Sequence, residues 1–340
     1  MTGRRKAGSR AALAVLAVAL GLLAACGSDL PQDSLDPEGP VARQLDQLIQ
    51  PVFLVAGLVF LLVEGLVLYV AIRFRRRSDD DAPVQVHGNA KLELTWTVIP
   101  ALILTVIGVL TVGTLVDLDR RPTGPGVVPV TVIGHQWWWE FAYPGRDVVT
   151  ANELHIPIDR KIDLTLESVD VVHSFWPPKL AGKLDVIPNR KNHMVIEADE
   201  PGTYFGQCAE FCGIAHGDMR LRVVAHTPEA FERWVADNAK PAVLPGPDQA
   251  EAAAGAMLFR QKGCASCHSV KGFAAGRFGP DLTHLHQRKV FAGAIFELDE
   301  RNLRRWIRNP PEEKPGSLMP KLELSEDEIT QLIAYLDTLK

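Results

Sequence analysis

The stretch Cys208-Ala-Glu210-Phe-Cys212-Gly-Ile-Ala-His216-Gly-Asp-Met219 concentrates metal-binding side chains more densely than any other part of the 340-residue chain. It holds two thiols, an imidazole and a thioether, a combination that favours copper in electron transfer. Two thiolates four residues apart on a loop can bridge two copper ions, each of which then needs one histidine and one weak axial ligand. The loop supplies one of each type, so a second histidine must come from elsewhere. The best candidate is His173, in Val171-Val-His173-Ser-Phe-Trp.

Two other chemistries would use the same thiols. Cys208 and Cys212 could form a disulfide, or they could belong to a structural zinc site. A disulfide would leave His216 and Met219 unexplained, and zinc sites rarely recruit methionine. The chain has five cysteines in all, too few for a secreted fold held together by disulfides.

The segment around this loop is predicted to be all-β. Short β-prone runs at 130–133, 163–166 and 193–196 are separated by proline and glycine turns. This pattern is typical of a sandwich or barrel.

From about residue 45 to 240 the chain resembles subunit II of cytochrome c oxidase. The loop resembles the CuA loop of that family, and two further motifs carry the likeness: Leu92-Glu93-Leu-Thr-Trp96-Thr-Val-Ile-Pro100 and Gly134-His-Gln-Trp137-Trp-Trp139-Glu. The resemblance implies a cupredoxin-like barrel in which the two cysteines bridge a mixed-valence copper pair. It also implies that His216 and the backbone carbonyl of Glu210 complete one copper, and that His173 and Met219 complete the other.

The same resemblance implies three further roles. The side chain of Glu210 would bind a magnesium ion at the border with subunit I. Trp137 would pass electrons from a docked donor to CuA, although packing against the barrel is the plain alternative for each of the three tryptophans. Glu93 would sit at the mouth of a proton pathway into subunit I, or would be an ordinary interfacial carboxylate.

The N-terminus is predicted to be a signal peptide of residues 1–25. Four basic residues precede an apolar stretch over 11–24, which ends in Leu23-Ala24-Ala25-Cys26. These last four residues resemble the bacterial lipobox, which predicts cleavage before Cys26 and its lipidation. A simple membrane segment with an incidental cysteine is the alternative, although the stretch is short for a span.

Two long apolar runs, Pro51–Ile72 and Thr97–Val116, are each about long enough to cross a bilayer as a helix. Arginines 73, 75, 76 and 77 lie between them and predict a cytoplasmic loop. Both ends of this hairpin then face outward. We expect a multi-pass protein of the bacterial cell (inner) membrane, with the CuA and heme c domains on the outer or periplasmic side. Glu64, inside the first run, either contacts a larger membrane complex or handles protons.

A second cofactor is predicted beyond a proline-rich linker at 241–248. Cys264-Ala-Ser-Cys267-His268 matches the pattern for covalent heme c, in which both thiols add to the heme and the histidine ligates iron. The sixth ligand should be Met319, with His284 and His286 as rivals.

Residues 249–340 resemble small all-α cytochromes c. Ile329, Leu332, Ile333 and Leu336 show helical spacing, and Tyr335 on that helix is expected to pack against the helix of Gly255 and Phe259. Met257 is expected in the core. Gly279-Pro280 resembles the loop that supports the histidine ligand.

The expected organisation is therefore a signal peptide (1–25), a lipid-anchored tether and two-helix hairpin (26–120), a cupredoxin CuA domain (121–240), a linker (241–248) and a cytochrome c domain (249–340). A CuA loop and a heme c module in one chain resemble subunit II of caa3-type oxidases. That resemblance implies an electron path from an external donor to heme c, CuA and then heme a of subunit I, where oxygen reduction and most proton handling occur.

The partners implied are oxidase subunits I and III, membrane lipid, and cytochrome c or a cytochrome bc complex as donor. The formal net charge of −5 carries no bulk signal for nucleic acid. Three other protein classes share part of the pattern. A quinol oxidase subunit lacks the copper ligands, nitrous oxide reductase needs a large additional catalytic domain, and a copper-delivery protein has little use for heme c or a membrane hairpin.

Overall fold

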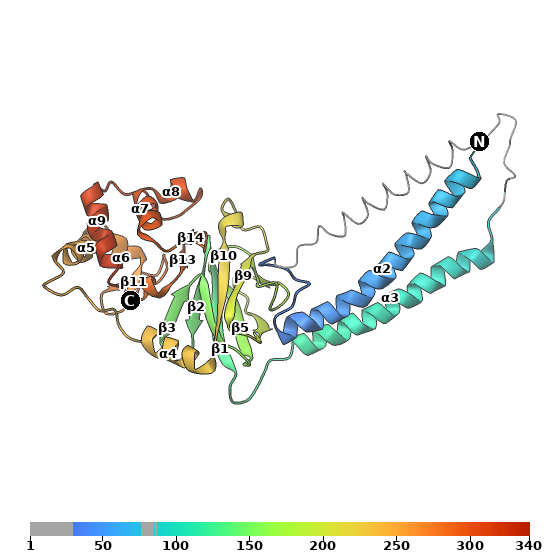
Figure 1. Cartoon of the computed structure of the whole chain (residues 1–340), viewed down its shortest axis with the longest axis horizontal. Helices are drawn as coiled ribbons and strands as arrows, with labels where there is room; N and C mark the ends of the chain where they lie inside the picture. The colour runs from blue at the N-terminus through green and yellow to red at the C-terminus, as the bar shows by residue number, and fades with distance from the viewer. Residues whose placement is uncertain (1–29, 76–84, 86) are drawn as a thin grey trace, which may run out of the picture.

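The computed structural model describes residues 30–75, 85 and 87–340. The predicted signal peptide, Cys26, Arg76 and Arg77 lie outside these residues. A long helical hairpin, a β domain and a helical domain follow one another along the molecule, as Figure 1 shows.

The hairpin consists of α2 (Pro40–Arg73) and α3 (Ala90–Leu118). Each helix contains one predicted apolar run, and both are long and apolar enough to cross a membrane. Most of the side chains in the two apolar runs are exposed, as lipid-facing side chains of a span would be. The prediction of a two-helix transmembrane hairpin is therefore confirmed.

The start of α2 is fixed to the β domain. A Cβ atom on Gly39, the residue before α2, would lie 2.1 Å from the carbonyl oxygen of Glu197, so the two backbones touch. The Lys179 ammonium donates hydrogen bonds to Asp36 and Glu38, which precede the helix. The start of α2 and the end of α3 therefore lie beside the β domain, and the end of α2 and the start of α3 lie at the far end (Figure 1).

The β domain is built from two five-stranded sheets. The first has the order β3-β2-β1-β5-β8 and the second the order β4-β10-β9-β6-β7. The strands are β1 (Val128–His135), β2 (Trp138–Tyr143), β3 (Val148–Ala151), β4 (Glu153–Pro157), β5 (Ile162–Ser168), β6 (His173–Trp176), β7 (Leu184–Val186), β8 (Asn192–Ile196), β9 (Gly202–Cys208) and β10 (Arg220–His226).

Apolar side chains alternate with polar ones along β1 and β5, so that one face of the sheet forms the core. The second sheet closes over this face, and α4 (Pro228–Asn238) adds Phe231 and Val235 to the same core. The prediction of an all-β cupredoxin-like fold is confirmed.

The helical domain comprises α5 (Ala250–Gln261), α6 (Cys264–Cys267), α7 (Glu300–Arg308), α8 (Pro310–Glu313) and α9 (Glu326–Leu336). Two short hairpins join these helices: β11 (Ser269–Val270) with β12 (Ala274–Ala275), and β13 (Val290–Phe291) with β14 (Phe296–Glu297). A 3₁₀ turn, η2 (Leu285–Gln287), lies between the hairpins, and another, η1 (His216–Asp218), belongs to the β domain.

Helices α5 and α9 cross in close contact, and the four apolar residues predicted to share a face of α9 are all buried. A Cβ atom on Gly255 would lie 1.8 Å from the carbonyl oxygen of Gln331, so the crossing requires glycine. The rings of Tyr335 and Phe259 pack edge to face with centroids 5.4 Å apart, as expected from the sequence. The prediction of a core position for Met257 is wrong, because its side chain is 60% exposed. Its side chain lies on the side of α5 that faces solvent and not on the side that packs into the core.

Candidate functional site

The paired cysteines and their predicted partners meet at one end of the β domain. Strand β6 pairs with β9 and so brings His173, which is distant in sequence, beside Cys208 at the end of β9. The loop from β9 to η1 then supplies the remaining predicted groups.

The predicted ligand atoms cluster tightly. The Sγ atoms of Cys208 and Cys212 are 3.8 Å apart. His173 Nδ1 lies 4.0 Å from Cys208 Sγ, and His216 Nδ1 lies 3.6 Å from Cys212 Sγ. Met219 Sδ is 3.8 Å from Cys212 Sγ, and the carbonyl oxygen of Glu210 is 3.2 Å from Cys208 Sγ. The sulfur separation is nearly twice the length of a disulfide bond, about 2.05 Å. The two thiols are therefore not joined in the structure.

The surroundings favour a metal-binding state of Cys208. The neighbouring Cys212 thiol lowers the pKa of Cys208 to about 3, which stabilises a thiolate at this position, and the same contact raises the pKa of Cys212. Asp170 Oδ1 lies 2.8 Å from His173 Nε2, so the carboxylate holds the ring with Nδ1 facing the sulfurs. A carboxylate in this outer position is the usual support for a metal-ligating histidine. Asp170 was not predicted, although it lies only three residues before His173.

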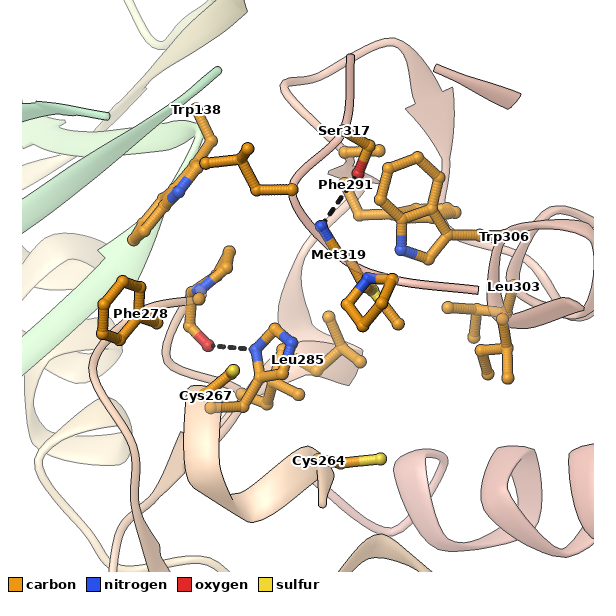
Figure 2. Close-up of a pocket in the computed structure, with 18 of the residues that line it drawn as sticks. Trp138, Cys264, Cys267, Phe278, Leu285, Phe291, Leu303, Trp306, Ser317 and Met319 are labelled. Atoms are coloured by element: carbon orange, nitrogen blue, oxygen red, sulfur yellow. Dashed lines mark hydrogen bonds between the residues drawn. The ribbon is translucent and has the colours of Figure 1, made fainter. Parts of the chain in front are cut away.

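The C-x-x-C-H motif lines a cavity of about 300 Å³ between the helical domain and the β domain. Figure 2 shows Cys264, Cys267 and Met319 around this cavity, among apolar side chains that include Leu285 and Phe291. The four predicted heme-binding residues, Cys264, Cys267, His268 and Met319, all contribute to its wall. Two thiols, an imidazole and a thioether in an apolar cavity fit a covalently attached heme c.

The histidine of this motif is oriented for ligation. His268 Nδ1 lies 2.8 Å from the carbonyl oxygen of Pro280, which leaves Nε2 to face the cavity. Burial lowers the pKa of His268, so the ring is neutral, as a metal ligand must be. A Cβ atom on Gly279 would lie 2.5 Å from the His268 ring, so the supporting loop needs glycine here.

The two rival histidines are engaged elsewhere. His284 is buried with its ring nitrogens 2.7 and 3.0 Å from the carbonyl oxygens of Lys340 and Lys240. His286 lies partly exposed beside Asp337. These contacts favour Met319 over either histidine as the sixth ligand.

Trp137 connects the cavity to the cysteine loop. Its side chain is 8% exposed and forms part of the cavity wall. Its indole Nε1 donates a 3.0 Å hydrogen bond to the carbonyl oxygen of Cys212, and the Gln136 side chain donates to the same oxygen at 2.7 Å. The peptide bond before Trp137 is cis.

The other two tryptophans of the triplet have different surroundings. Trp138 stacks on His135 and reaches the cavity from the β domain (Figure 2), and Trp139 is fully buried in the β core. Packing therefore explains Trp139, whereas Trp137 bridges two sites.

Glu93 lies far from both clusters, at the start of α3. Its carboxylate accepts a hydrogen bond from the backbone N–H of Asn89, the residue that caps this helix. Capping is thus one role of Glu93 in the described structure.

Comparison with known proteins agrees with this architecture. Residues 32–112 match the family model for the transmembrane domain of cytochrome c oxidase subunit II, residues 145–226 match its periplasmic domain, and residues 252–340 match cytochrome c. Cytochrome c oxidase subunit 2 of Alkalihalophilus pseudofirmus is 38% identical over 325 residues, which cover 94% of each chain. The chain belongs to the cytochrome c oxidase subunit II family.

Two other members of the wider group show the range of similarity. Cytochrome c oxidase subunit 2 of Bacillus subtilis is 34% identical over 351 residues, covering 96% of each chain. Quinol oxidase subunit 2 of Bacillus spizizenii is 37% identical over 211 residues, covering 59% of this chain and 64% of its own. Membership of the subunit II family implies copper, and the cytochrome c module implies heme c, in a membrane protein that works with subunit I of a heme–copper oxidase.

Proposed function

We propose that this chain is the electron-accepting subunit of a proton-translocating cytochrome c oxidase. It receives electrons from cytochrome c or a cytochrome bc complex through heme c and the CuA centre, and passes them to heme a of subunit I. Oxygen is reduced to water in that subunit, with proton translocation. The observation that carries the proposal is the position of Trp137, which lines the heme cavity and donates a hydrogen bond to Cys212 in the copper loop.

The residues that would hold the two cofactors are those that the sequence predicted. Cys208, Cys212, His216, the Glu210 carbonyl, His173 and Met219 would together hold the coppers. Cys264 and Cys267 would attach heme c covalently, and His268 and Met319 would ligate its iron. When bound, the copper pair and the heme each take up and release one electron. The protein keeps these groups in fixed positions, which limits the rearrangement that electron transfer requires.

The hairpin supports the proposed membrane placement. Arg73 and Arg75 lie at the end of α2 farthest from the β domain, and positive charge favours the cytoplasmic side. The β and helical domains then lie on the outer side of the inner membrane. A lipidated Cys26 would anchor the N-terminal tether on the same side.

Two further roles and one further subunit belong to the assembled complex. The Glu210 side chain contributes to a magnesium site at the border with subunit I. Glu93, at the cytoplasmic end of α3, serves a proton pathway into subunit I in addition to capping its helix. Subunit III completes the assembly.

The test compares Trp137→Phe with Trp138→Phe in the assembled oxidase. Both residues line the cavity, but only Trp137 is hydrogen-bonded to the copper loop. After rapid mixing with reduced cytochrome c, heme c reduction should be unchanged in both variants. Copper reduction, followed in the near infrared, should slow at least tenfold in Trp137→Phe alone. Wild-type copper reduction in Trp137→Phe would refute the role of Trp137, and copper reduction ahead of heme would refute the route.

A further inference from the structure

A lysine of the helical domain is buried against the backbone of the β domain. Lys314, just after α8, is 3% exposed. Its ammonium group donates hydrogen bonds to the carbonyl oxygens of Trp137 (2.7 Å), Asp218 (2.8 Å) and Ala292 (2.9 Å). The first two acceptors belong to the β domain. Three donors on one ammonium meet three acceptors, so the group is fully satisfied in this arrangement.

A carboxylate of the β domain makes the reciprocal contact. Glu153, at the start of β4, is 1% exposed, and its Oε1 accepts from the backbone N–H groups of Lys289 (2.7 Å) and Val290 (2.9 Å). Beside it, the Arg220 N–H donates to the carbonyl oxygen of Gly293 at 2.9 Å. Each domain therefore inserts one charged side chain into the backbone of the other.

These buried contacts differ in kind from the ion pairs around them. Lys271 with Asp147, and Arg222 with Glu297, join the domains through carboxylates that are largely exposed, and exposed pairs add little stability. An unpartnered charge in the interior is strongly unfavourable. Burial lowers the pKa of Lys314 to about 7, so its ammonium form depends on the three carbonyl contacts, and these contacts favour one relative orientation of the two domains.

The same orientation covers Trp137. Its carbonyl is bound by Lys314, and its indole is bound to Cys212. The chain after Lys314 passes over the ring, because a Cβ atom on Gly316 would lie 3.1 Å from it.

We propose that Lys314 is a positioning residue that docks the helical domain against Trp137 in one fixed orientation and closes Trp137 to any separate protein donor. An external donor must then deliver its electron to the helical domain. The fixed docking stands on the contacts alone. Its consequence for electron delivery rests on the proposed function.

The experiment uses Lys314→Met in the full-length chain within the oxidase. The matched control is Lys271→Met, which removes a lysine that also contacts both Asp147 and the Ala239 carbonyl oxygen but is 34% exposed. Hydrogen–deuterium exchange is measured for peptides that contain the amides of Lys289, Val290 and Arg220. In Lys314→Met these amides should exchange at least tenfold faster than in wild type, with the copper and covalent heme spectra retained. Lys271→Met should exchange like wild type. The kinetics of the Trp137→Phe variant test the electron route separately. Their outcome does not affect the interpretation of the hydrogen–deuterium exchange.

Wild-type exchange in a Lys314→Met protein that keeps both spectra would overturn the proposal, and so would equal acceleration in Lys271→Met. If Lys314→Met does not yield a protein with both the copper and the heme spectrum, the same exchange measurement is made on Gly293→Ala instead. Its Cβ atom would lie 2.5 Å from both Lys314 Nζ and the Asp218 carbonyl oxygen. It should loosen the same amides while Lys314 itself is kept, and unchanged exchange in that variant would equally overturn the docking role.

Discussion

Replacement of Gly279 by alanine should disturb the histidine of the heme motif. The added Cβ would lie 2.5 Å from Cε1 and 2.8 Å from Nδ1 of His268, whereas ordinary contact begins at 3.4 Å. The ring must therefore move by about 0.9 Å to restore a normal contact. A movement of this size is enough to break the 2.8 Å bond between Nδ1 and the Pro280 carbonyl oxygen.

The expected loss of folding stability in Gly279→Ala can be estimated. Overpacking of this kind costs about 1–3 kcal/mol, and a lost hydrogen bond costs about 1 kcal/mol more. The midpoint of thermal unfolding of a domain this small falls by about 4–8 °C for each kcal/mol. The heme potential should also rise, because the bond to Pro280 makes His268 a stronger donor that favours ferric iron.

The assay is thermal unfolding of the full-length chain followed by heme absorbance, together with a redox titration. Arg277→Ala is the control, since Arg277 is an exposed neighbour of the same loop. If Gly279→Ala matched this control in both midpoint and potential, the reasoning about the supporting loop would be refuted.

Three further predictions concern the copper loop, the sixth ligand and the response to pH. Cys212→Ser should abolish the paired-copper absorption and leave heme absorbance; survival of the purple chromophore would contradict the bridging role. Met319→His should keep covalent heme, lower its potential and remove the near-infrared sulfur-to-iron band, whereas persistence of that band would exclude Met319 as ligand. Burial lowers the pKa of His226 from its usual value of about 6.5 to about 4, so the unfolded chain binds a proton in this range that the folded chain does not. The stability of the β domain should therefore fall between pH 6.5 and 4, and urea unfolding of His226→Gln should show a smaller fall.

Local patterns were sufficient for much of the fold. The apolar runs in α2 and α3 are each long enough to cross a membrane, and the apolar spacing on α9 matches its buried face. Such patterns depend only on neighbours along the chain, which is why they can be read without coordinates. The wrong prediction for Met257 shows the limit of such patterns. An apolar residue on a helix does not by itself indicate whether that side of the helix packs against another element.

The candidate sites divide in the same way. The cysteine loop and the C-x-x-C-H motif are contiguous, so their predicted chemistry rests on spacing. His173 comes beside the cysteines only through the pairing of β6 with β9. The partners of Trp137 could not be predicted. Lys314 is 177 residues away in the chain, and a lysine is ordinarily a solvated surface group.

The sequence by itself determined which residues can bind copper and heme, and which segments can cross a membrane, because ligand type, spacing and hydropathy are local properties. Only the tertiary structure decided that the two C-terminal domains dock with Trp137 between their sites. That arrangement depends on Lys314 and Glu153 finding backbone partners across an interface. Hydrogen bonds of this kind are set by the packing of two separately folded surfaces and leave no pattern in the order of the residues.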